Sequence, residues 1–279
     1  MKPEDLPQQL IKTFLPKNLR RRANHWYKFR KADYILVSYP KCGRTWLRVM
    51  LSHYYVERFG LAVGSLLDFA NLHYQNPEVP KIFLSNDVLN EVLHRTRPPG
   101  VIDHDKSAYY GRKVIYLARD PRDVVVSMYF QRSKRDHNYQ GSLLDFIDDE
   151  VDGLQTIIRF YNAWAAALPR IGKSLLIRYE DMRADPGAVL ARLLEFTGHD
   201  PDRDMVQRAV EASSFERMKK MERNNEFDRS WLKAGDSTDE ESFKVRRGKI
   251  GGYADYLEDT DIDRLNRLIR ETLAPDFGY

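Results

Sequence analysis

The sequence predicts an α/β fold in which helices flank a central parallel β-sheet. Three short apolar runs rich in β-branched residues are typical of buried strands, and a helical pattern follows each of them. Strands that alternate with helices predict a parallel sheet covered on both faces, with ligands bound at the carboxyl ends of the strands. The three predicted strands are Tyr34 to Pro40, Lys113 to Arg119 and Ser174 to Glu180.

Six helical patterns complete the predicted elements. The helix after the second strand has the clearest start, because Asp120 suits the capping position and Pro121 the first helical position. No internal repeat, low-complexity tract or Pro/Gly/Ser-rich linker marks a boundary, so one domain is expected over residues 1–279. The predicted helices are Thr45 to Arg58, Pro121 to Lys134, Leu143 to Leu168, Pro186 to Thr197, Asp202 to Met221 and Asp259 to Leu273.

The composition excludes several classes of protein. A chain of 279 residues with 42% hydrophobic content can bury a large core, and its single cysteine excludes an internal disulfide. Seven scattered histidines without a zinc-binding spacing predict no metal site. The net charge of +4 is too small to predict nucleic-acid binding. The chain lacks both a signal-peptide pattern and a run of 18 apolar residues, so no membrane span and a cytoplasmic location are expected.

The stretch YPKCGRTW, Tyr39 to Trp46, follows the first predicted strand and has the features of an anion-binding loop. A strand that leads into a helix presents backbone N–H groups and the positive end of the helix dipole. Lys41 adds a charge, Gly43 permits close backbone approach, and Thr45 offers a hydroxyl in the first turn. The lysine precedes the glycine, unlike the nucleoside-triphosphate loop, so ATP or GTP is not the expected ligand. An ordinary strand-to-helix turn remains the alternative for this stretch alone.

Two further basic elements lie later in the chain. Arg119 ends the second predicted strand, where its guanidinium can bind a phosphate, and Ser127 follows about two turns into the next helix. The segment FKVRRGKIGGY contains four cations, no acid and three glycines, and a solvated basic face would not need those glycines. A solvated basic face remains the alternative for this segment alone. Its cations are Lys244, Arg246, Arg247 and Lys249, and its glycines are Gly248, Gly251 and Gly252.

Taken together, these motifs resemble the cytosolic-type sulfotransferase family that uses 3′-phosphoadenosine 5′-phosphosulfate, with a likeness to bacterial members. YPKCGRTW is similar to the family's loop for the 5′-phosphosulfate, usually Tyr-Pro-Lys-Ser-Gly-Thr-Thr-Trp, and YLARDPRDVVVS is similar to its 3′-phosphate element. RRGKIGGY resembles the C-terminal glycine signature, and IRYEDMRADP and SSFERMK resemble the adenine elements. The resemblance implies a P-loop-like phosphosulfate-binding loop and these donor-binding residues: Lys41, Cys42, Gly43, Arg44, Thr45 and Trp46 in the loop, Arg119, Ser127, Arg246, Arg247 and Gly248 at the 3′-phosphate, and Tyr179, Ser213 and Phe215 at the adenine.

The resemblance also implies an activity, the direct in-line transfer of a sulfuryl group to a hydroxyl acceptor. Lys41 and the loop amides would stabilise the charge that grows on the leaving 5′-phosphate, without a metal. Cys42 in place of serine leaves a reactive thiol as an alternative, and Arg44 in place of threonine could contact an acidic acceptor or only reach solvent. Two other classes compete with a sulfotransferase, namely a P-loop nucleotide kinase and a non-catalytic nucleotide- or RNA-binding protein.

A histidine is the expected general base, because its ordinary pKa suits proton removal near neutral pH. His104 lies one connection before the second phosphate strand, where the family has its catalytic histidine, and is the first candidate. His94 is the second candidate, and a surface position for His104 is the plain alternative. Lys106 is the expected replacement for a family lysine near the sulfuryl group.

The acceptor stays open among a phenol, a steroid-like alcohol and a saccharide. A dimer motif of the family, Lys-x-x-x-Thr-Val-x-x-x-Glu, is not matched, so the oligomeric state is open too. Seven aromatic residues outside the matched motifs could line an apolar acceptor site or belong to the ordinary core. They are Tyr54, Tyr55, Phe69, Tyr74, Phe83, Tyr129 and Trp231.

Overall fold

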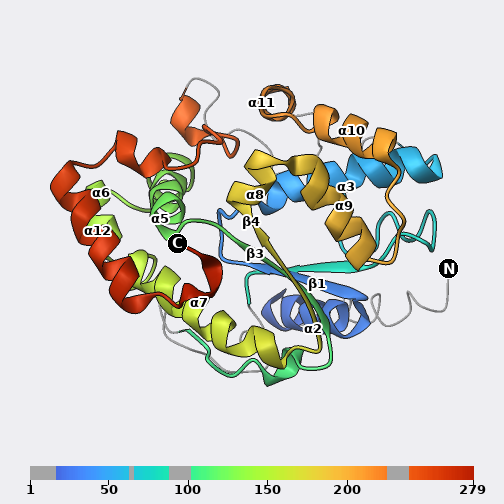
Figure 1. Ribbon diagram of the computed structural model, residues 1–279, viewed down its shortest axis with the longest axis horizontal. Helices are drawn as coiled ribbons and strands as arrows, with labels where there is room; N and C mark the ends of the chain where they lie inside the picture. Colours follow the sequence, from blue (N-terminus) through green and yellow to red (C-terminus); the bar gives the residue numbers. More distant parts are fainter. Residues whose placement is uncertain (1–16, 63–65, 88–101, 225–238) are drawn as a thin grey trace.

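The computed structural model describes residues 17–62, 66–87, 102–224 and 239–279, whose strands form one parallel sheet (Figure 1). The sheet has four strands in the order β2-β1-β3-β4. The α/β prediction with a central parallel sheet is confirmed, and the three predicted strands are present. The fourth, β2, was not predicted, because four residues give too short a pattern. The strands are β1 (Tyr34–Ser38), β2 (Ile82–Ser85), β3 (Lys113–Ala118) and β4 (Lys173–Arg178).

Helices cover both faces of the sheet. Tyr34 of β1 contacts Phe196 of α9 (Pro186–Phe196), whereas Tyr116 of β3 contacts Trp164 of α7 (Leu154–Ala167). Tyr116 pairs with Val37, three residues after Tyr34, so the two aromatic side chains lie on opposite faces of the sheet. Helix α3 (Arg44–Phe59) lies near α9 in Figure 1, and α2 (Lys17–Lys31) lies on the face of α7.

Two long predicted helices are each divided in two. The predicted helix Leu143 to Leu168 is α6 (Leu143–Ile147) and α7, because a turn intervenes in which the Asp149 carboxylate accepts from two backbone N–H groups. Gly153 closes this turn, since a Cβ there would lie 2.2 Å from the Asp149 carbonyl oxygen. The predicted helix Asp202 to Met221 is α10 (Arg203–Ala212) and α11 (Phe215–Arg223).

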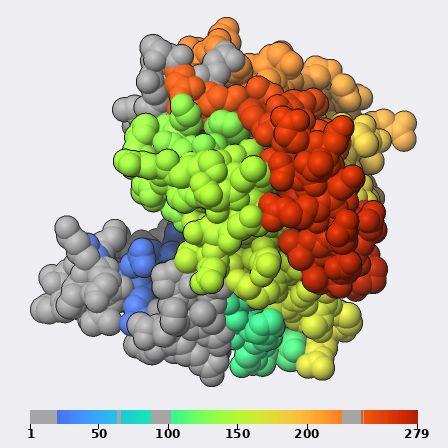
Figure 2. All heavy atoms as spheres, turned by 90° about the vertical axis from the view of Figure 1, so that its left-hand side faces the viewer, coloured from blue at the N-terminus to red at the C-terminus, as the bar shows by residue number. Residues whose placement is uncertain are grey.

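The remaining helices agree with the predictions apart from their ends. The helix predicted at Pro121 to Lys134 is α5 (Pro121–Phe130) followed by a π-helical turn at Gln131–Arg135. The short α8 (Tyr179–Ala184) begins where the third strand was expected to end. Near the end of the chain, α12 (Asp259–Thr272) lies against the surface formed by α6 and α7 (Figure 2), where Arg264 pairs with Asp148.

Candidate active site

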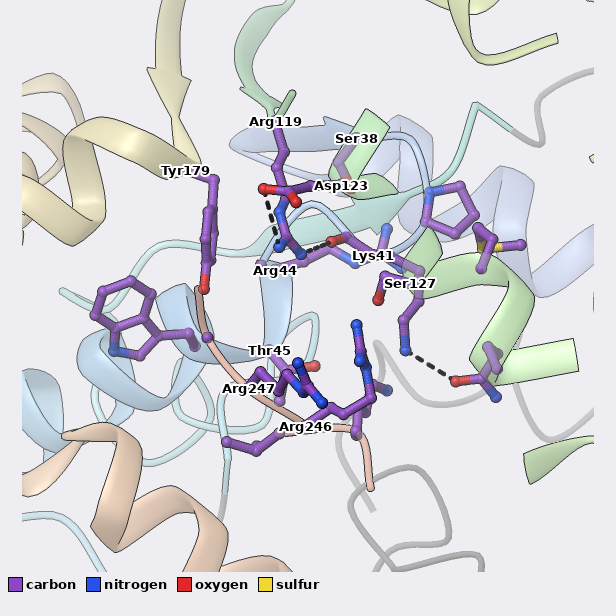
Figure 3. Close-up of a pocket in the computed structure, with 18 of the residues that line it drawn as sticks. Ser38, Lys41, Arg44, Thr45, Arg119, Asp123, Ser127, Tyr179, Arg246 and Arg247 are labelled. Carbon is purple, nitrogen blue, oxygen red and sulfur yellow. Dashed lines mark hydrogen bonds and ion pairs between the residues drawn. The ribbon is translucent and has the colours of Figure 1, made fainter. Parts of the chain in front are cut away.

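A cavity of about 570 Å³ opens at the carboxyl ends of β1 and β3 (Figure 3). Every residue that the sequence predicted for donor binding lines this cavity, except Cys42 and Ser213. Segments that are far apart in the chain therefore meet there, as the rule for parallel sheets requires. The predicted residues that line it are Lys41, Gly43, Arg44, Thr45, Trp46, Arg119, Ser127, Tyr179, Phe215, Arg246, Arg247 and Gly248.

The loop between β1 and α3 forms the floor of the cavity. Lys41 and Gly43 both have positive φ angles, 69° and 97°, so the loop turns sharply before the helix begins. A Cβ at Gly43 would lie 2.6 Å from the Tyr179 ring, so only glycine allows this close approach. The left-handed conformation of Lys41 is uncommon for a residue with a Cβ, and such strain is concentrated at functional sites.

Arg119 joins the loop to the C-terminal basic segment. Its guanidinium donates to the carbonyl oxygens of Lys41 and Lys249, both at 3.2 Å, and lies 3.6 Å from the Asp123 carboxylate. It also lies over the Tyr179 ring, 4.3 Å from the centroid. In Figure 3, Arg119 enters the cavity from above, while Arg246 and Arg247 enter from below. The predicted 3′-phosphate residues thus surround one region of the cavity.

Two buried carboxylates hold the basic segment against the cavity. Glu222 of α11 accepts from the backbone N–H groups of Lys244 and Val245, at 2.7 and 2.8 Å. Asp123 of α5 accepts from those of Gly251 and Tyr253, at 3.0 and 3.1 Å. Both carboxylates are almost wholly buried, so each amide bond made there is shielded from water. The residues between these two anchors, which include Arg246 and Arg247, are therefore fixed at both ends.

The anchored segment also needs a glycine and carboxylate partners for its arginines. Gly248 has a φ of 62°, and a Cβ there would lie 2.8 Å from the Phe215 ring. Arg246 donates to Glu241 at 2.8 Å and lies over the Phe130 ring, and Arg247 donates to Asp255 at 3.0 Å. These contacts orient both guanidinium groups before any anion is bound.

Lys41 has an unusual electrostatic environment. Its pKa is lowered to about 7, mainly by burial and also by the nearby cations Lys244, Arg135 and Arg119. Its ammonium donates to the Gln131 side-chain oxygen at 2.9 Å, and the Gln131 amide donates to Asp136 at 2.8 Å. The π-helical turn places Gln131 and Asp136 at this point of the cavity, where both line the wall.

The interpretation of Cys42 and Ser213 as donor-binding side chains needs correction. Cys42 is fully buried, and its sulfur lies 3.4 Å from the Tyr161 hydroxyl. Burial raises the pKa of the Cys42 thiol to about 12, which opposes a thiolate nucleophile. Ser213 is also fully buried, and its hydroxyl donates to the Ala209 carbonyl oxygen at 2.8 Å. Both side chains therefore face the protein interior.

The residues expected for catalysis outside the loop do not reach the cavity. His104 is exposed and is not among the residues that line the cavity. Lys106 is buried and pairs with Asp87 and the Asp103 carbonyl oxygen, so its charge is already matched within the core. The interpretation of Lys106 as a contact of the sulfuryl group is therefore corrected. His94 lies outside the described residues.

Several residues of the cavity were missed by sequence reasoning. The end of β2 supplies Leu84 and Asn86, but a four-residue strand gave no usable signal. Asp123 follows Arg119 by four residues, and that helical spacing could have indicated their contact. Gln131 carries no comparable signal, and neither does Glu222, the buried anchor of the basic segment, since their roles depend on which distant segments pack beside them.

The aromatic residues proposed as an alternative acceptor lining mostly belong to the core. Tyr54 and Tyr55 are fully buried and Phe69 and Phe83 nearly so, and none of the four lines the cavity. Tyr74 is exposed and Tyr129 packs against the core, whereas Trp231 lies outside the described residues.

Comparison with known proteins identifies the family. A model described as "Sulfotransferase domain" matches residues 31–276. The chain belongs to the sulfotransferase family. Cytosolic sulfotransferase 17 of Arabidopsis thaliana is 31% identical, with 89% of this chain and 76% of that protein covered. Flavonol 3-sulfotransferase of Flaveria bidentis is 23% identical, with 91% and 86% covered. These matches do not favour a nucleotide kinase.

Solved structures of sulfotransferases share the fold. Mouse sulfotransferase SULT7A1, solved as a complex with PAP, superimposes with a TM-score of 0.60 at 20% identity, covering 87% of this chain and 85% of that one. Retinol dehydratase, solved with androsterone and the inactive cofactor PAP, gives 0.58 at 21% identity, covering 86% and 80%. Within the described ranges, no helix has the length and apolar character needed to cross a membrane, and no three His, Cys, Asp or Glu side chains group as metal ligands.

Proposed function

We propose that this sulfotransferase-family protein transfers the sulfuryl group of 3′-phosphoadenosine 5′-phosphosulfate to a hydroxyl acceptor. One observation carries the proposal, namely that a single cavity collects cations from the loop, the end of β3 and the basic segment, with aromatic rings beside them. These cations are Lys41, Arg119, Arg246 and Arg247. The proposed donor has two anionic groups on one adenosine, and the PAP complexes of SULT7A1 and retinol dehydratase support this choice.

Three polar atoms in the cavity wall support the fit of such a donor. Ser38 Oγ, Trp46 Nε1 and Arg119 Nε are buried and have no hydrogen-bond partner among the described residues. A buried polar atom without a partner is costly, and a polar ligand would satisfy it. Gly43 lies against the Tyr179 ring and Gly248 against the Phe215 ring, so closely that a Cβ at either position would clash. These two rings are the proposed contacts of the adenine.

Lys41 is proposed to act on the leaving side of the reaction. The donor supplies an activated sulfuryl group, and transfer leaves negative charge on its 5′-phosphate. An ammonium in a buried site stabilises such a charge more strongly than it would in water. The link from Lys41 through Gln131 to Asp136 holds the ammonium in position without any ligand.

Asp136 is the proposed proton acceptor, in place of the histidine first expected. Two carboxylates line the cavity among the described residues, and Asp123 already accepts from two backbone amides. The Gln131 side chain connects Lys41 to Asp136, which directly follows the π-helical turn. Asp136→Asn should lower kcat by about a hundredfold, the usual contribution of a positioned base. A variant that retains wild-type turnover would exclude this role.

Transfer from labelled donor to phenols, lipid alcohols and saccharides in parallel tests the proposed function directly. We expect product that is independent of added metal and persists in a chelator, and we expect no transfer from labelled ATP. Calorimetry provides the second test, because adenosine 3′,5′-bisphosphate should bind more tightly than ADP. Equal affinity for the two nucleotides, together with no sulfated product, would refute the proposal.

The cellular setting is proposed on the same basis. Relatives are named as cytosolic sulfotransferases, which supports a cytosolic location. The name of flavonol 3-sulfotransferase supports a small-molecule hydroxyl acceptor. A single domain over residues 1–279, the absence of a metal cofactor and no nucleic-acid partner stay predictions from the sequence. The oligomeric state stays open.

A further inference from the structure

The cations of the cavity point to two sides of the phosphate loop. Arg119 extends from the end of β3, on one side of β1. Arg44 instead donates from Nη1 to the carbonyl oxygen of Ser85, the last residue of β2, at 3.0 Å. Since β2 and β3 flank β1 on opposite sides, the two guanidinium groups serve opposite sides of the loop. Figure 3 shows Arg44 at the loop and Arg119 above it.

Arg44 has no carboxylate within ion-pair distance among the described residues, and the Ser85 carbonyl is the hydrogen-bond acceptor found for it there. Arg119, Arg246 and Arg247 differ, because each has an Asp or Glu oxygen within 3.6 Å. A guanidinium has five N–H donors, so one carbonyl oxygen leaves most of its capacity unused. Burial lowers the pKa of Arg44 to about 10, which still leaves it protonated at neutral pH.

The surroundings of Arg44 add positive charge. Arg48, one turn along α3, and Lys244 of the basic segment line the same cavity. Burial lowers the pKa of Lys244 to about 8, with Arg135, Arg44 and Arg48 as further causes, so these cations act on one another. Glu222, a carboxylate close to these cations, is engaged by Arg135 and two backbone amides. An anion entering from the β2 side would meet Arg44 in a region of positive charge.

The anionic groups of the proposed donor do not account for Arg44. In the proposed binding mode, Arg119, Arg246 and Arg247 bind the 3′-phosphate, and Lys41 with the loop amides binds the phosphosulfate. Arg44, which the sequence assigned to the donor, is then available to another group. Beyond Arg44, the end of β2 contributes Asn86 and Leu84 to the cavity wall, and no aromatic ring lies among the β2 residues that line it. A polar site with an unmatched cation is suited to a charged ligand more than to an apolar one.

We propose that Arg44, together with Asn86, which follows its partner Ser85 and lines the same cavity, forms a subsite that binds a negatively charged group of the acceptor. A carboxylate or a sulfate ester has the planar or forked oxygens that a guanidinium binds through two hydrogen bonds. The inference rests on the proposed function and narrows it, because a hydroxy acid or an acidic saccharide becomes the acceptor class in place of a steroid-like alcohol.

The test compares an acid with its neutral counterpart on the protein loaded with adenosine 3′,5′-bisphosphate. The first pair is 4-hydroxyphenylacetate and 4-hydroxyphenylacetamide, and the second is glucuronate and glucose. Calorimetry should show that at least one acid binds about tenfold or more tightly than its neutral partner. Arg44→Gln should bring that ratio close to one, and Arg44→Lys should retain part of it. Arg119→Gln is the matched control, which should weaken nucleotide binding and leave the ratio unchanged.

Two outcomes would overturn the subsite. One is that neither acid binds better than its neutral partner, and the other is that Arg44→Gln weakens acid and neutral ligand equally. Failure of the proposed function is separate from both, since it would appear as equal binding of adenosine 3′,5′-bisphosphate and ADP in the wild-type protein. A protein that prefers the bisphosphate and transfers sulfate to neutral hydroxyls would keep its function and lose only this subsite.

Discussion

The donor side of the cavity and its β2 edge are built in different ways. On the donor side, the loop after β1, Arg119 after β3 and Tyr179 after β4 each belong to a short continuous motif. At the β2 edge, Asn86 follows a short strand, and Arg44 at the start of α3 donates to Ser85, the last residue of that strand. The difference indicates that backbone geometry and fixed spacing form the proposed nucleotide site, whereas side chains brought together by packing form the proposed acceptor subsite.

A buried network of hydrogen bonds around Asp87 also supports the β2 edge. Asp87, with a φ of 62°, pairs with Lys106 and accepts from the hydroxyl of Tyr109 at 2.9 Å and from Trp164 Nε1 at 3.3 Å. This network lies next in sequence to Asn86. Lys106 thus supports the β2 edge from within the core, in place of the direct contact expected from the sequence.

The largest effect on turnover is expected at Lys41, in the loop between β1 and α3. Lys41→Ala should lower kcat by about a hundredfold to a thousandfold, because its interaction strengthens as the leaving group gains charge. Single-turnover kinetics with labelled donor measures the step, and Lys41→Arg is the control that retains the charge. If only the Michaelis constant rises, Lys41 belongs to donor binding alone.

Substitution of Arg119 should distinguish the donor side of the cavity from its β2 edge most clearly. Arg119→Ala should reduce the preference for adenosine 3′,5′-bisphosphate over ADP by about tenfold to a hundredfold, since a charge-assisted contact to the 3′-phosphate is lost. Calorimetry with both nucleotides measures this ratio. Arg44→Ala is the comparison from the β2 edge and should leave the ratio nearly intact. An equal loss in both variants would contradict the separation of the donor side from the β2 edge.

Asp123 tests whether the donor side depends on the anchored basic segment. An asparagine at this position has one acceptor oxygen in place of two, so the amide of Gly251 or Tyr253 loses its partner. Asp123→Asn should weaken bisphosphate binding by about tenfold and increase hydrogen exchange in residues 246–253. Glu222→Gln is the matched change at the other anchor. Unchanged exchange in both variants would contradict the anchoring role.

The pH dependence of donor binding should be moderate and should depend on Lys41. Its pKa of about 7 means that near pH 7 much of the free protein has a neutral amine, and a bound anion raises that pKa. Affinity is therefore full below pH 7 and falls as the pH rises above it, with uptake of a fraction of one proton. Calorimetry in buffers of different ionisation enthalpy counts this uptake. Lys41→Gln should take up fewer protons, and an unchanged count would assign the effect to another group.

The smallest effect is expected at His104. Its exposed position outside the cavity predicts that His104→Ala changes kcat by less than about twofold, far below the loss of a positioned base. Steady-state kinetics on the same acceptor as Asp136→Asn provides the comparison. A loss of about a hundredfold in His104→Ala would restore the histidine as the base.

How much of the cavity the sequence predicted depends on the kind of pattern that each element leaves in it. The loop, Arg119 and Gly248 line the cavity as expected, because the residue types and spacing typical of a phosphate site are short-range features that a sequence shows directly. Cys42 and Ser213 were assigned from motif position, but their side chains face the interior. Motif position specifies where the backbone lies, whereas the direction of a side chain depends on what packs around it.

The sequence by itself determined the α/β class, three of the four strands and the donor side of the cavity, because hydrophobic periodicity and short-range spacing carry that information. Only the tertiary structure decided which charges are matched. Lys106 pairs with Asp87 inside the core, while Arg44 lies beside β2 without a carboxylate among the described residues. The sequence alone does not show that Lys106 is paired with a carboxylate and Arg44 is not. Charge pairing depends on contacts between segments that are distant in the chain.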